Sequence, residues 1–210
     1  MRLFSHWSPR YIRDRVMEML YQKAFPDHPW MTKDANKILD SLLRPDDVGL
    51  EFGSGRSTLW FARRVRHLIS IERNPAWYEK INEKLQSQGI GNVKYIYNVQ
   101  DNDESRRSPV AYAAIFDEIQ DSSLDFVLID GLFRGLCAGH AIRCVKPGGM
   151  IIIDDVNRYL PSNSRAPGSL KSNATPTSDW TDFYETTNTW RRIWTTSGVT
   201  DTAIYFKPCP

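Results

Sequence analysis

Two acidic residues and a glycine-rich turn near residue 50 could together hold a nucleotide cofactor. Glu51 lies in a short apolar run, Val48–Phe52, and the turn Gly53-Ser54-Gly55 follows it directly. Glu72 closes a second apolar run, 21 positions after Glu51. This order is typical of a doubly wound sheet, in which ligands bind beyond the carboxyl ends of the strands. Glu72 is then expected to hold a ribose diol through two charge-assisted hydrogen bonds.

The charge and spacing of the turn indicate which nucleotide it binds. A dinucleotide site needs a third glycine and an anion-binding turn, but Thr58 stands at the third position and Glu51 is a poor neighbour for phosphate. S-adenosylmethionine has no phosphate and carries an ammonium and a sulfonium, which Glu51 would favour. Glycines at 53 and 55 would let the backbone approach its methionyl part. We therefore predict an S-adenosylmethionine site, with a dinucleotide site or an ordinary surface turn as alternatives.

Three further carboxylates follow the predicted fourth and fifth strands: Asp130, Asp154 and Asp155. Adjacent strands lie about 4.8 Å apart, so these side chains could meet over the edge of the sheet. There they would bind Mg²⁺, which lowers the pKa of an attacking hydroxyl, or Asp130 or Asp154 would act as a metal-free general base. In the structural alternative, Asp154 and Asp155 only end the strand and pair with nearby arginines at 134 or 158.

A regular alternation of strands and helices positions these residues and predicts a parallel sheet with right-handed crossovers. The predicted strands are Val48–Phe52, His67–Glu72, Val93–Tyr97, Leu124–Asp130 and Met150–Asp154, with helices at about Ser57–Val65, Pro75–Gln88, Val110–Ile119 and Leu136–Val145. Lys146-Pro147-Gly148-Gly149 is predicted to be a turn into the fifth strand. After a polar loop, Asn157–Ser178, and a short helix, Asp182–Thr187, two strands at Trp190–Thr195 and Thr202–Phe206 predict an antiparallel hairpin at one sheet edge.

Two helical patterns precede the first strand, at Pro9–Tyr21 and from Thr32 to Leu43. We expect residues 1–44 to form an N-terminal helical extension and residues 45–210 to form a Rossmann-like domain, as one globular unit. The first helix could pack on this core or on a second copy of the chain, so a homodimer is possible.

These residues resemble the class I S-adenosylmethionine-dependent methyltransferases from about Pro29 to Phe206. The resemblance is carried by Glu51-Phe52-Gly53-Ser54-Gly55, by Glu72, by Asp130-Gly131 and by Lys146-Pro147-Gly148-Gly149. It implies a mostly parallel seven-stranded sheet of order 3-2-1-4-5-7-6 with strand 7 antiparallel. Asp130-Gly131 followed by Asp154-Asp155 is most similar to the small-molecule O-methyltransferases. Some of those use a magnesium site, whose last ligand is typically Asn where Asp155 stands here.

The resemblance also assigns roles to single residues. It places Glu51 and Gly53 near the methionyl group, Glu72 at the ribose, Asp101 near the adenine amine, and Asp130 near the methionyl ammonium and the reacting centre. The complete set of expected cofactor-binding residues is Glu51, Gly53, Ser54, Gly55, Ser57, Glu72, Asp101 and Asp130. Asp130 and Asp154 are the expected catalytic residues, and Asp130, Asp154 and Asp155 the candidate magnesium ligands.

The acceptor side carries weaker signals. Arg158, Tyr159 and Arg165 could hold a polar or anionic acceptor, although solvated loop arginines are equally ordinary. Trp30, Trp180 and Trp190 could roof the pocket or simply pack in the core. We predict methyl transfer to a small polar acceptor at oxygen. An NAD-dependent oxidoreductase and a non-catalytic S-adenosylmethionine-binding module are the alternatives.

Composition limits the partners. The net charge of the 210 residues is +2, so the overall charge does not indicate binding to nucleic acid or to an anionic membrane. The arginines at 2, 10, 13 and 15 could contact phosphate, but such segments are usually solvated. No apolar run is long enough to span a membrane, and the N-terminus has no apolar core of a secretory signal. The three cysteines lack metal-like spacing, which favours a reducing, cytoplasmic location.

Overall fold

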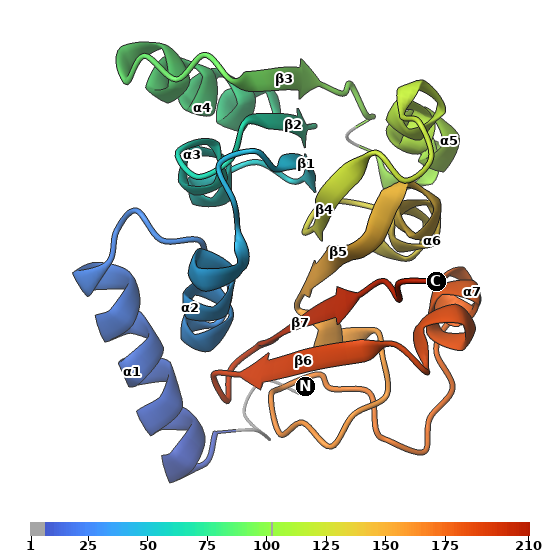
Figure 1. The fold of residues 1–210 in the computed structure, drawn as a ribbon. Helices are drawn as coiled ribbons and strands as arrows, with labels where there is room; N and C mark the ends of the chain where they lie inside the picture. The colour runs from blue at the N-terminus through green and yellow to red at the C-terminus, as the bar shows by residue number, and fades with distance from the viewer. Residues whose placement is uncertain (1–6, 102) are drawn as a thin grey trace.

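The computed structural model describes residues 7–101 and 103–210, and a seven-stranded sheet lies at the centre (Figure 1). The strands are β1 (Val48–Phe52), β2 (His67–Glu72), β3 (Val93–Tyr97), β4 (Leu124–Ile129), β5 (Val145–Asp154), β6 (Arg191–Thr196) and β7 (Asp201–Phe206). Their order across the sheet is β3-β2-β1-β4-β5-β7-β6. β7 runs antiparallel to both of its neighbours, and the other pairs are parallel. The predicted fold class and strand order are confirmed.

Helices cover both faces of the sheet because its central strands bury apolar side chains on each face. They are α1 (Pro9–Ala24), α2 (Lys33–Leu42), α3 (Arg56–Ala62), α4 (Pro75–Ser87), α5 (Pro109–Ala113), α6 (Arg134–Cys144) and α7 (Ser178–Thr187). Short 3₁₀ turns lie at Glu104–Arg106, Ala114–Glu118 and Val156–Arg158. One core packs α2 and α3 on the sheet around Leu39 and Phe61. A second core packs α5, α6 and α7 on the opposite face around Ala138 and Phe183.

A glycine in β1 fixes the distance between α3 and the sheet. Gly49 pairs with Phe126 of β4, and a Cβ at Gly49 would lie only 2.1 Å from the ring of Phe126. The same ring stacks on Phe61 of α3, with the two ring centroids 4.8 Å apart. Because protein cores are close-packed, this contact holds α3, and the glycine turn before it, in one position over β1.

Several predicted boundaries differ from the structure. The turn predicted at 146–149 is a bulge inside β5, since Leu124 pairs with Val145 whereas Phe126 pairs with Met150. The helix predicted at 110–119 is divided between α5 and the 3₁₀ turn that follows it. The C-terminal hairpin is confirmed at one edge of the sheet, with β7 between β5 and β6 as the predicted order requires.

The two N-terminal helices pack differently. α1 has no buried residue, whereas α2 buries Ala35, Asn36 and Leu39. Thr32 caps α2, as predicted, and its hydroxyl oxygen lies 2.5 Å from that of Thr195 in β6. The segment that enters α2 is therefore tied to the sheet. Residues 1–6 lie outside the described residues, and they include Arg2, one of the arginines considered as a phosphate contact. No helix in the described part is long and apolar enough to cross a membrane.

Candidate active site

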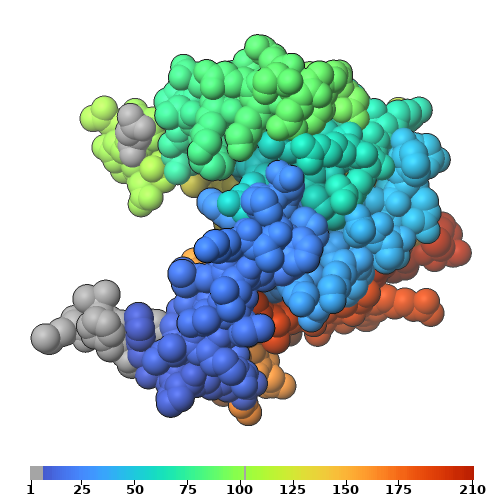
Figure 2. Space-filling model, turned by 90° about the vertical axis from the view of Figure 1, so that its left-hand side faces the viewer, coloured from blue at the N-terminus to red at the C-terminus, as the bar shows by residue number. Residues whose placement is uncertain are grey.

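A cavity of about 410 Å³ opens at the carboxyl ends of β1, β2 and β4. This is the crevice in which doubly wound sheets bind ligands, and its volume is in the range of small-molecule sites. The surface is hollowed between the blue N-terminal segment and the green segment around β3 (Figure 2). The lining residues are Trp30, Gly53, Ser54, Gly55, Arg56, Ser57, Glu72, Arg73, Trp77, Tyr112, Asp130, Gly131, Leu132 and Arg134.

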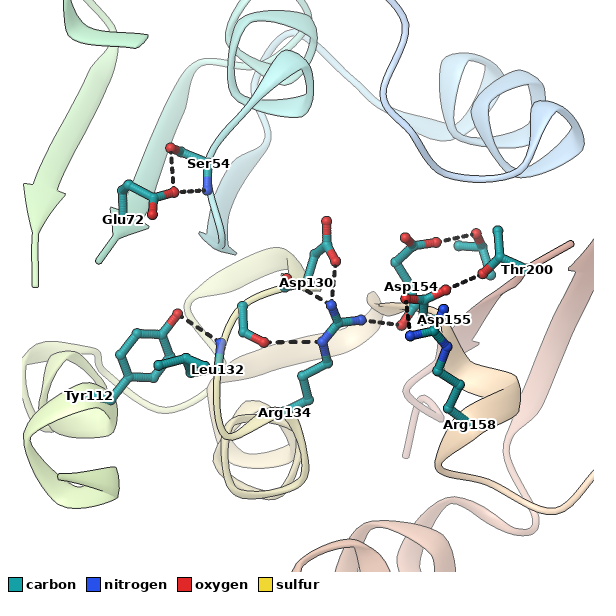
Figure 3. A network of polar contacts seen from close by, with 12 residues as sticks. Ser54, Glu72, Tyr112, Asp130, Leu132, Arg134, Asp154, Asp155, Arg158 and Thr200 are labelled. Carbon is teal, nitrogen blue, oxygen red and sulfur yellow. Dashed lines mark hydrogen bonds and ion pairs between the residues drawn. The ribbon is translucent and has the colours of Figure 1, made fainter. Parts of the chain in front are cut away.

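Glu72 is held rigidly at the end of β2. One carboxylate oxygen accepts hydrogen bonds from the backbone N–H groups of Arg73 at 2.9 Å and Asn74 at 2.7 Å. The other accepts from the backbone N–H of Ser54 at 3.0 Å and from its hydroxyl at 2.8 Å (Figure 3). Of these four donors only the hydroxyl of Ser54 can turn away, and it lies 2.6 Å from the hydroxyl of Tyr95. A ligand hydroxyl could therefore replace Ser54 at Glu72 while Ser54 turns to Tyr95.

Glu51 lies behind the glycine turn and does not line the cavity. It is fully buried, and one of its oxygens accepts hydrogen bonds from Thr58 at 2.6 Å and Ser70 at 2.7 Å. Thr58 in turn accepts from the backbone N–H of Gly55 at 2.9 Å. Burial raises the pKa of Glu51 to about 7, although the hydroxyls around it oppose this rise. The acid thus shapes the turn through Thr58.

This arrangement bears on the choice between cofactors. In a dinucleotide site the N–H groups of the turn point at a pyrophosphate. Here the N–H of Gly55 donates to Thr58 inside the turn, and Thr58 occupies the position of the third glycine. A buried carboxylate, Glu51, lies directly behind them. The turn is therefore poorly suited to a pyrophosphate, and the residues present fit a cofactor without phosphate.

The turns after β1 and β4 touch each other through two glycines. Gly53 has φ +89°, and a Cβ there would lie 2.9 Å from the backbone of Asp130. A Cβ at Gly131 would lie 2.1 Å from the hydroxyl oxygen of Tyr112 and 3.1 Å from the backbone nitrogen of Gly53. Tyr112 also accepts a hydrogen bond from the backbone N–H of Leu132 at 3.2 Å. The cofactor turn and the Asp130 turn thus form one packed floor.

Asp130 is held by Arg134. The guanidinium donates to the carboxylate of Asp130 at 2.7 Å and to the backbone carbonyls of Asp130, Gly131 and Asp154 at 2.7 to 3.1 Å (Figure 3). Burial, together with the charges of Asp155 and Glu72, raises the pKa of Asp130 to about 6 against the opposing effect of Arg134. The side chain is still 38% exposed. A carboxylate that titrates near neutrality at a cavity wall is suited to accept a proton.

Asp154 and Asp155 bind the C-terminal hairpin. Asp154 accepts a hydrogen bond from the hydroxyl of Thr202 at 2.7 Å, and burial raises its pKa well above the ordinary range. Asp155 accepts from the hydroxyl of Thr200 and pairs with Arg158 at 3.5 Å. Neither aspartate lines the cavity, and the pair of Asp155 with Arg158 is the contact that the structural alternative named.

The expected magnesium site gains no support from this geometry. Within residues 7–101 and 103–210, no group of three histidine, cysteine or acidic side chains is arranged to hold a metal ion. Asp130, Asp154 and Asp155 are instead each engaged by a different partner: Arg134, Thr202 and Thr200. Within the described residues, the three carboxylates thus form no group that could hold a metal ion.

The mouth of the cavity is formed by aromatic rings and an arginine. Trp77 of α4 donates its indole N–H to the backbone carbonyl of Ser54 at 2.6 Å. Trp30 lies beside it, with ring centroids 6.5 Å apart, and is 54% exposed. The guanidinium of Arg56 lies over the ring of Trp30, 5.3 Å from its centroid. Trp30 is therefore at the pocket, one of the two placements that the sequence left open for it.

Most of the expected cofactor residues meet at this cavity. Its lining includes Gly53, Ser54, Gly55, Ser57, Glu72 and Asp130. Asp101 is not among them: it is exposed, and its carboxylate accepts a hydrogen bond from the backbone N–H of Asp103 at 2.9 Å. On the acceptor side, Trp180 is 1% exposed and stacks on Tyr159, so it is a core residue. Arg165 lines a different cavity.

The residues at or beside the cavity that were not expected from the sequence include Arg56, Trp77, Tyr95 and Tyr112. Arg56 lies inside the glycine motif itself, so its position could have drawn attention. The other three reach the site from α4, β3 and α5, and no local pattern marks them. Their roles depend on which elements lie side by side.

Comparison with solved structures identifies the fold. A methyltransferase-like protein from Silicibacter pomeroyi superposes with a TM-score of 0.58 at 20% identity, covering 86% of this chain and 88% of that one. A proposed caffeoyl-CoA O-methyltransferase from Staphylococcus aureus gives 0.55 at 15% identity, covering 98% and 95%. An rRNA methylase from Streptococcus thermophilus gives 0.53 at 9% identity, covering 84% and 95%.

Sequence comparison adds a shorter match. No protein-family model matches the chain. A 23S rRNA (uracil(1939)-C(5))-methyltransferase from Klebsiella pneumoniae is 34% identical over 80 residues, which are 37% of this chain and 18% of that protein. The chain is thus similar to less than a fifth of this curated relative.

The sheet order and the cavity at its switch point define a Rossmann-like α/β protein, with the cavity at the place where doubly wound sheets bind ligands. Together with the superpositions, they identify its fold as that of the class I S-adenosylmethionine-dependent methyltransferases. The resemblance found in the sequence is confirmed at the level of the fold.

Proposed function

We propose that this protein is an S-adenosylmethionine-dependent methyltransferase. The observation that carries the proposal is the cavity in which Glu72, the turn at 53–55 and Asp130 lie together at the ends of three neighbouring strands. The fold and the short match to a curated methyltransferase support it. When bound, S-adenosylmethionine would supply a methyl group activated by its sulfonium.

The residues of the chain would bind and orient the two reactants. Glu72 would accept the two ribose hydroxyls, with Ser54 turning to Tyr95 to make room. Glu51 would hold the turn through Thr58 without touching the ligand. The aromatic mouth of Trp30 and Trp77 would restrict water. Alignment of donor and acceptor alone can supply much of the rate.

The proposed acceptor is a small polar molecule that is methylated at oxygen. A hydroxyl acceptor must lose a proton as it takes the methyl group, and Asp130 is the group at the cavity wall suited to receive it. Arg134 would keep Asp130 pointed at the acceptor. The net charge of +2 supports a small molecule over nucleic acid. An RNA acceptor is the second candidate, because rRNA methylases are among the similar proteins.

Calorimetric titration with S-adenosylhomocysteine tests the cofactor. We expect micromolar binding that falls at least tenfold in Glu72→Ala, because two charge-assisted hydrogen bonds are lost. Asp101→Ala is the matched control, an aspartate outside the cavity, and its affinity should stay within about twofold. Absence of S-adenosylhomocysteine binding, or binding of NADH in its place, would refute the proposal.

The acceptor class is tested with labelled S-adenosylmethionine and two panels, one of small hydroxyl compounds and one of RNA. Transfer to a hydroxyl compound, with product stable to mild acid and base, supports methylation at oxygen. Transfer to RNA alone, with binding that weakens steeply as salt rises, would replace the small acceptor by nucleic acid.

A further inference from the structure

The first helix, α1, carries its apolar residues on the side that faces solvent. The side chains of Asp14 and Glu18 are only 15% and 9% exposed, and Tyr21, at helical spacing from them, lies half-buried on the same side. Large apolar side chains that are 46% to 60% exposed form what we call the apolar face of α1: Ile12, Val16, Met17, Met19 and Leu20. A surface helix that packs on a core has the reverse pattern, so α1 turns this face away from the core.

Contacts at both ends of α1 fix this orientation. The helix lies on the outside of the molecule, beside α2 and the turn between β6 and β7 (Figure 1). Near its start, Asp14 packs against that turn, where its carboxylate leaves no room for a side chain at Gly198. Near its end, the hydroxyl oxygen of Tyr21 lies 2.7 Å from Nδ1 of His28 and accepts a hydrogen bond from Nδ2 of Asn36 at 3.4 Å. The apolar face cannot turn inward unless these contacts break.

The basic residues of α1 are exposed together with its apolar face. The side chains of Arg10, Arg13 and Arg15 are 54% to 68% exposed, and Lys23 is exposed as well. The acids with which these arginines pair are the two on the inner side of the helix. The surface that α1 offers to solvent is thus apolar and cationic, which the small net charge of +2 does not reveal.

We propose that α1 binds the surface of an anionic lipid bilayer with this face. A helix at such a surface lies in the plane of the membrane, with its apolar side chains at the acyl boundary and its basic residues among the anionic headgroups. The long stems of arginine and lysine let the charged groups reach those headgroups beside a buried apolar stripe. Met17 and Leu20 also line a groove of about 390 Å³ with residues of α2, so the apolar surface continues beyond the helix.

The charge of this face argues against other partners. If a second copy of the chain covered it as an antiparallel helix, Arg13 and Arg15 of one copy would approach Lys23 of the other, and in a parallel pair each would meet its own counterpart. Like charges that face each other across an interface disfavour the complex. RNA would satisfy the basic residues but leave the apolar side chains in water. An anionic bilayer satisfies both, and its binding by α1 does not depend on the proposed methyl transfer.

Co-sedimentation of the full chain with unilamellar vesicles tests the proposal. The vesicles contain phosphatidylcholine alone or an equal mixture of phosphatidylcholine and phosphatidylserine. We expect binding to the mixed vesicles that weakens as salt rises, because salt screens surface charge. Val16→Ser combined with Leu20→Ser should bind them at least about tenfold more weakly, since less apolar surface is buried. Arg13→Gln combined with Lys23→Gln should lower the affinity by about 10- to 30-fold.

Matched variants outside α1 serve as controls. Val110→Ser removes an apolar side chain of α5 that is 79% exposed, and Arg66→Gln combined with Lys84→Gln removes two exposed positive charges. Both should bind the mixed vesicles as the wild type does. The substituted residues of α1 lie outside the cofactor cavity, so the affinity of those variants for S-adenosylhomocysteine should stay within about twofold. Their melting temperatures should not fall, because the side chains are exposed.

Each outcome decides the proposal. Binding to the mixed vesicles that both α1 variants lose and the control variants keep supports a membrane-binding helix. Absence of binding, or an equal loss in the control variants, overturns it. A wild type that is dimeric without lipid and becomes monomeric when Val16 and Leu20 are replaced would assign the face to a second copy of the chain. Retention of the protein by RNA but not by vesicles would assign the face to nucleic acid, and either result would overturn the proposal.

Discussion

Replacing Glu51 by glutamine should make the protein more stable at alkaline pH than the wild type, and the gain should vanish in acid. Glu51 is fully buried, and one of its oxygens has no hydrogen-bond partner. The other accepts hydrogen bonds from Thr58 and Ser70, and the carbonyl oxygen of glutamine can accept both. Glu51→Gln therefore keeps the shape and removes the charge.

The size of this stability difference follows from the pKa of Glu51. Burial raises the pKa of Glu51 from an ordinary 4.5 to about 7, so the folded state favours the protonated form. The associated stability is fully present below 4.5 and is lost as the pH rises through about 7. A tenfold change in a protonation equilibrium is worth about 1.4 kcal/mol. The ionised carboxylate therefore destabilises the folded wild type by about 3 kcal/mol above pH 7.

Urea unfolding of both proteins at about pH 5 and about pH 9 measures this destabilisation. The stability difference between variant and wild type at one pH is subtracted from the same difference at the other pH. Any cost of placing an amide at the site is the same at both pH values and therefore cancels. The contributions of the other titrating groups to the free energy of unfolding cancel as well, because both proteins contain them. The free-energy gap between Glu51→Gln and the wild type should shift by about 2.5 kcal/mol in favour of the variant, because a small part of the effect is already present at about pH 5. A gap that does not change with pH would refute a raised pKa at Glu51, and a change of opposite sign would mean that the carboxylate is stabilised by its hydroxyl partners.

Three further substitutions test other parts of the site and the fold. Ser54→Ala should leave the affinity for S-adenosylhomocysteine within about threefold in calorimetry, because the ligand displaces this hydroxyl from Glu72; a tenfold loss would mean that the hydroxyl itself binds the ligand. Asp130→Asn should lower kcat by about 10²- to 10⁴-fold. Wild-type activity should rise with pH through about 6 as Asp130 ionises, and an unchanged pH profile in the variant would contradict its role as the base. Gly49→Ala should cost about 1–3 kcal/mol in urea unfolding, since its Cβ would meet Phe126; Phe126→Leu should make the added methyl group less costly, and additive losses would contradict the contact.

Much of the fold could be predicted because its physical causes are local. The central strands are buried on both faces, so they read as apolar runs such as the one before Glu72. Because these strands are parallel, the acidic residues at their carboxyl ends lie at the same edge of the sheet. The bulge at 146–149 was read as a turn, because a proline and two glycines favour turns, and only the pairing with β4 reveals that the strand continues.

The site was harder to predict where it depends on contacts across the fold. Tyr95 and Tyr112 reach the cavity from β3 and α5, and nothing in their neighbouring residues indicates that. Asp101 was expected at the adenine, but it lies in a stretch that folds on itself through Asp103 and is exposed. Arg56 was visible in the motif, yet an arginine at the start of a helix has no distinctive signal until it is seen to line the cavity.

The position of β7 has a consequence for the way this chain is made. β7 fills the place between β5 and β6, although it is the last of the seven strands to be synthesised. Until it arrives, one edge of β5 has no backbone partner, and Asp154 lacks the hydroxyl of Thr202. An open strand edge is a template for pairing with other chains. The nascent protein therefore passes through an aggregation-prone stage that ends only when its final hairpin is inserted.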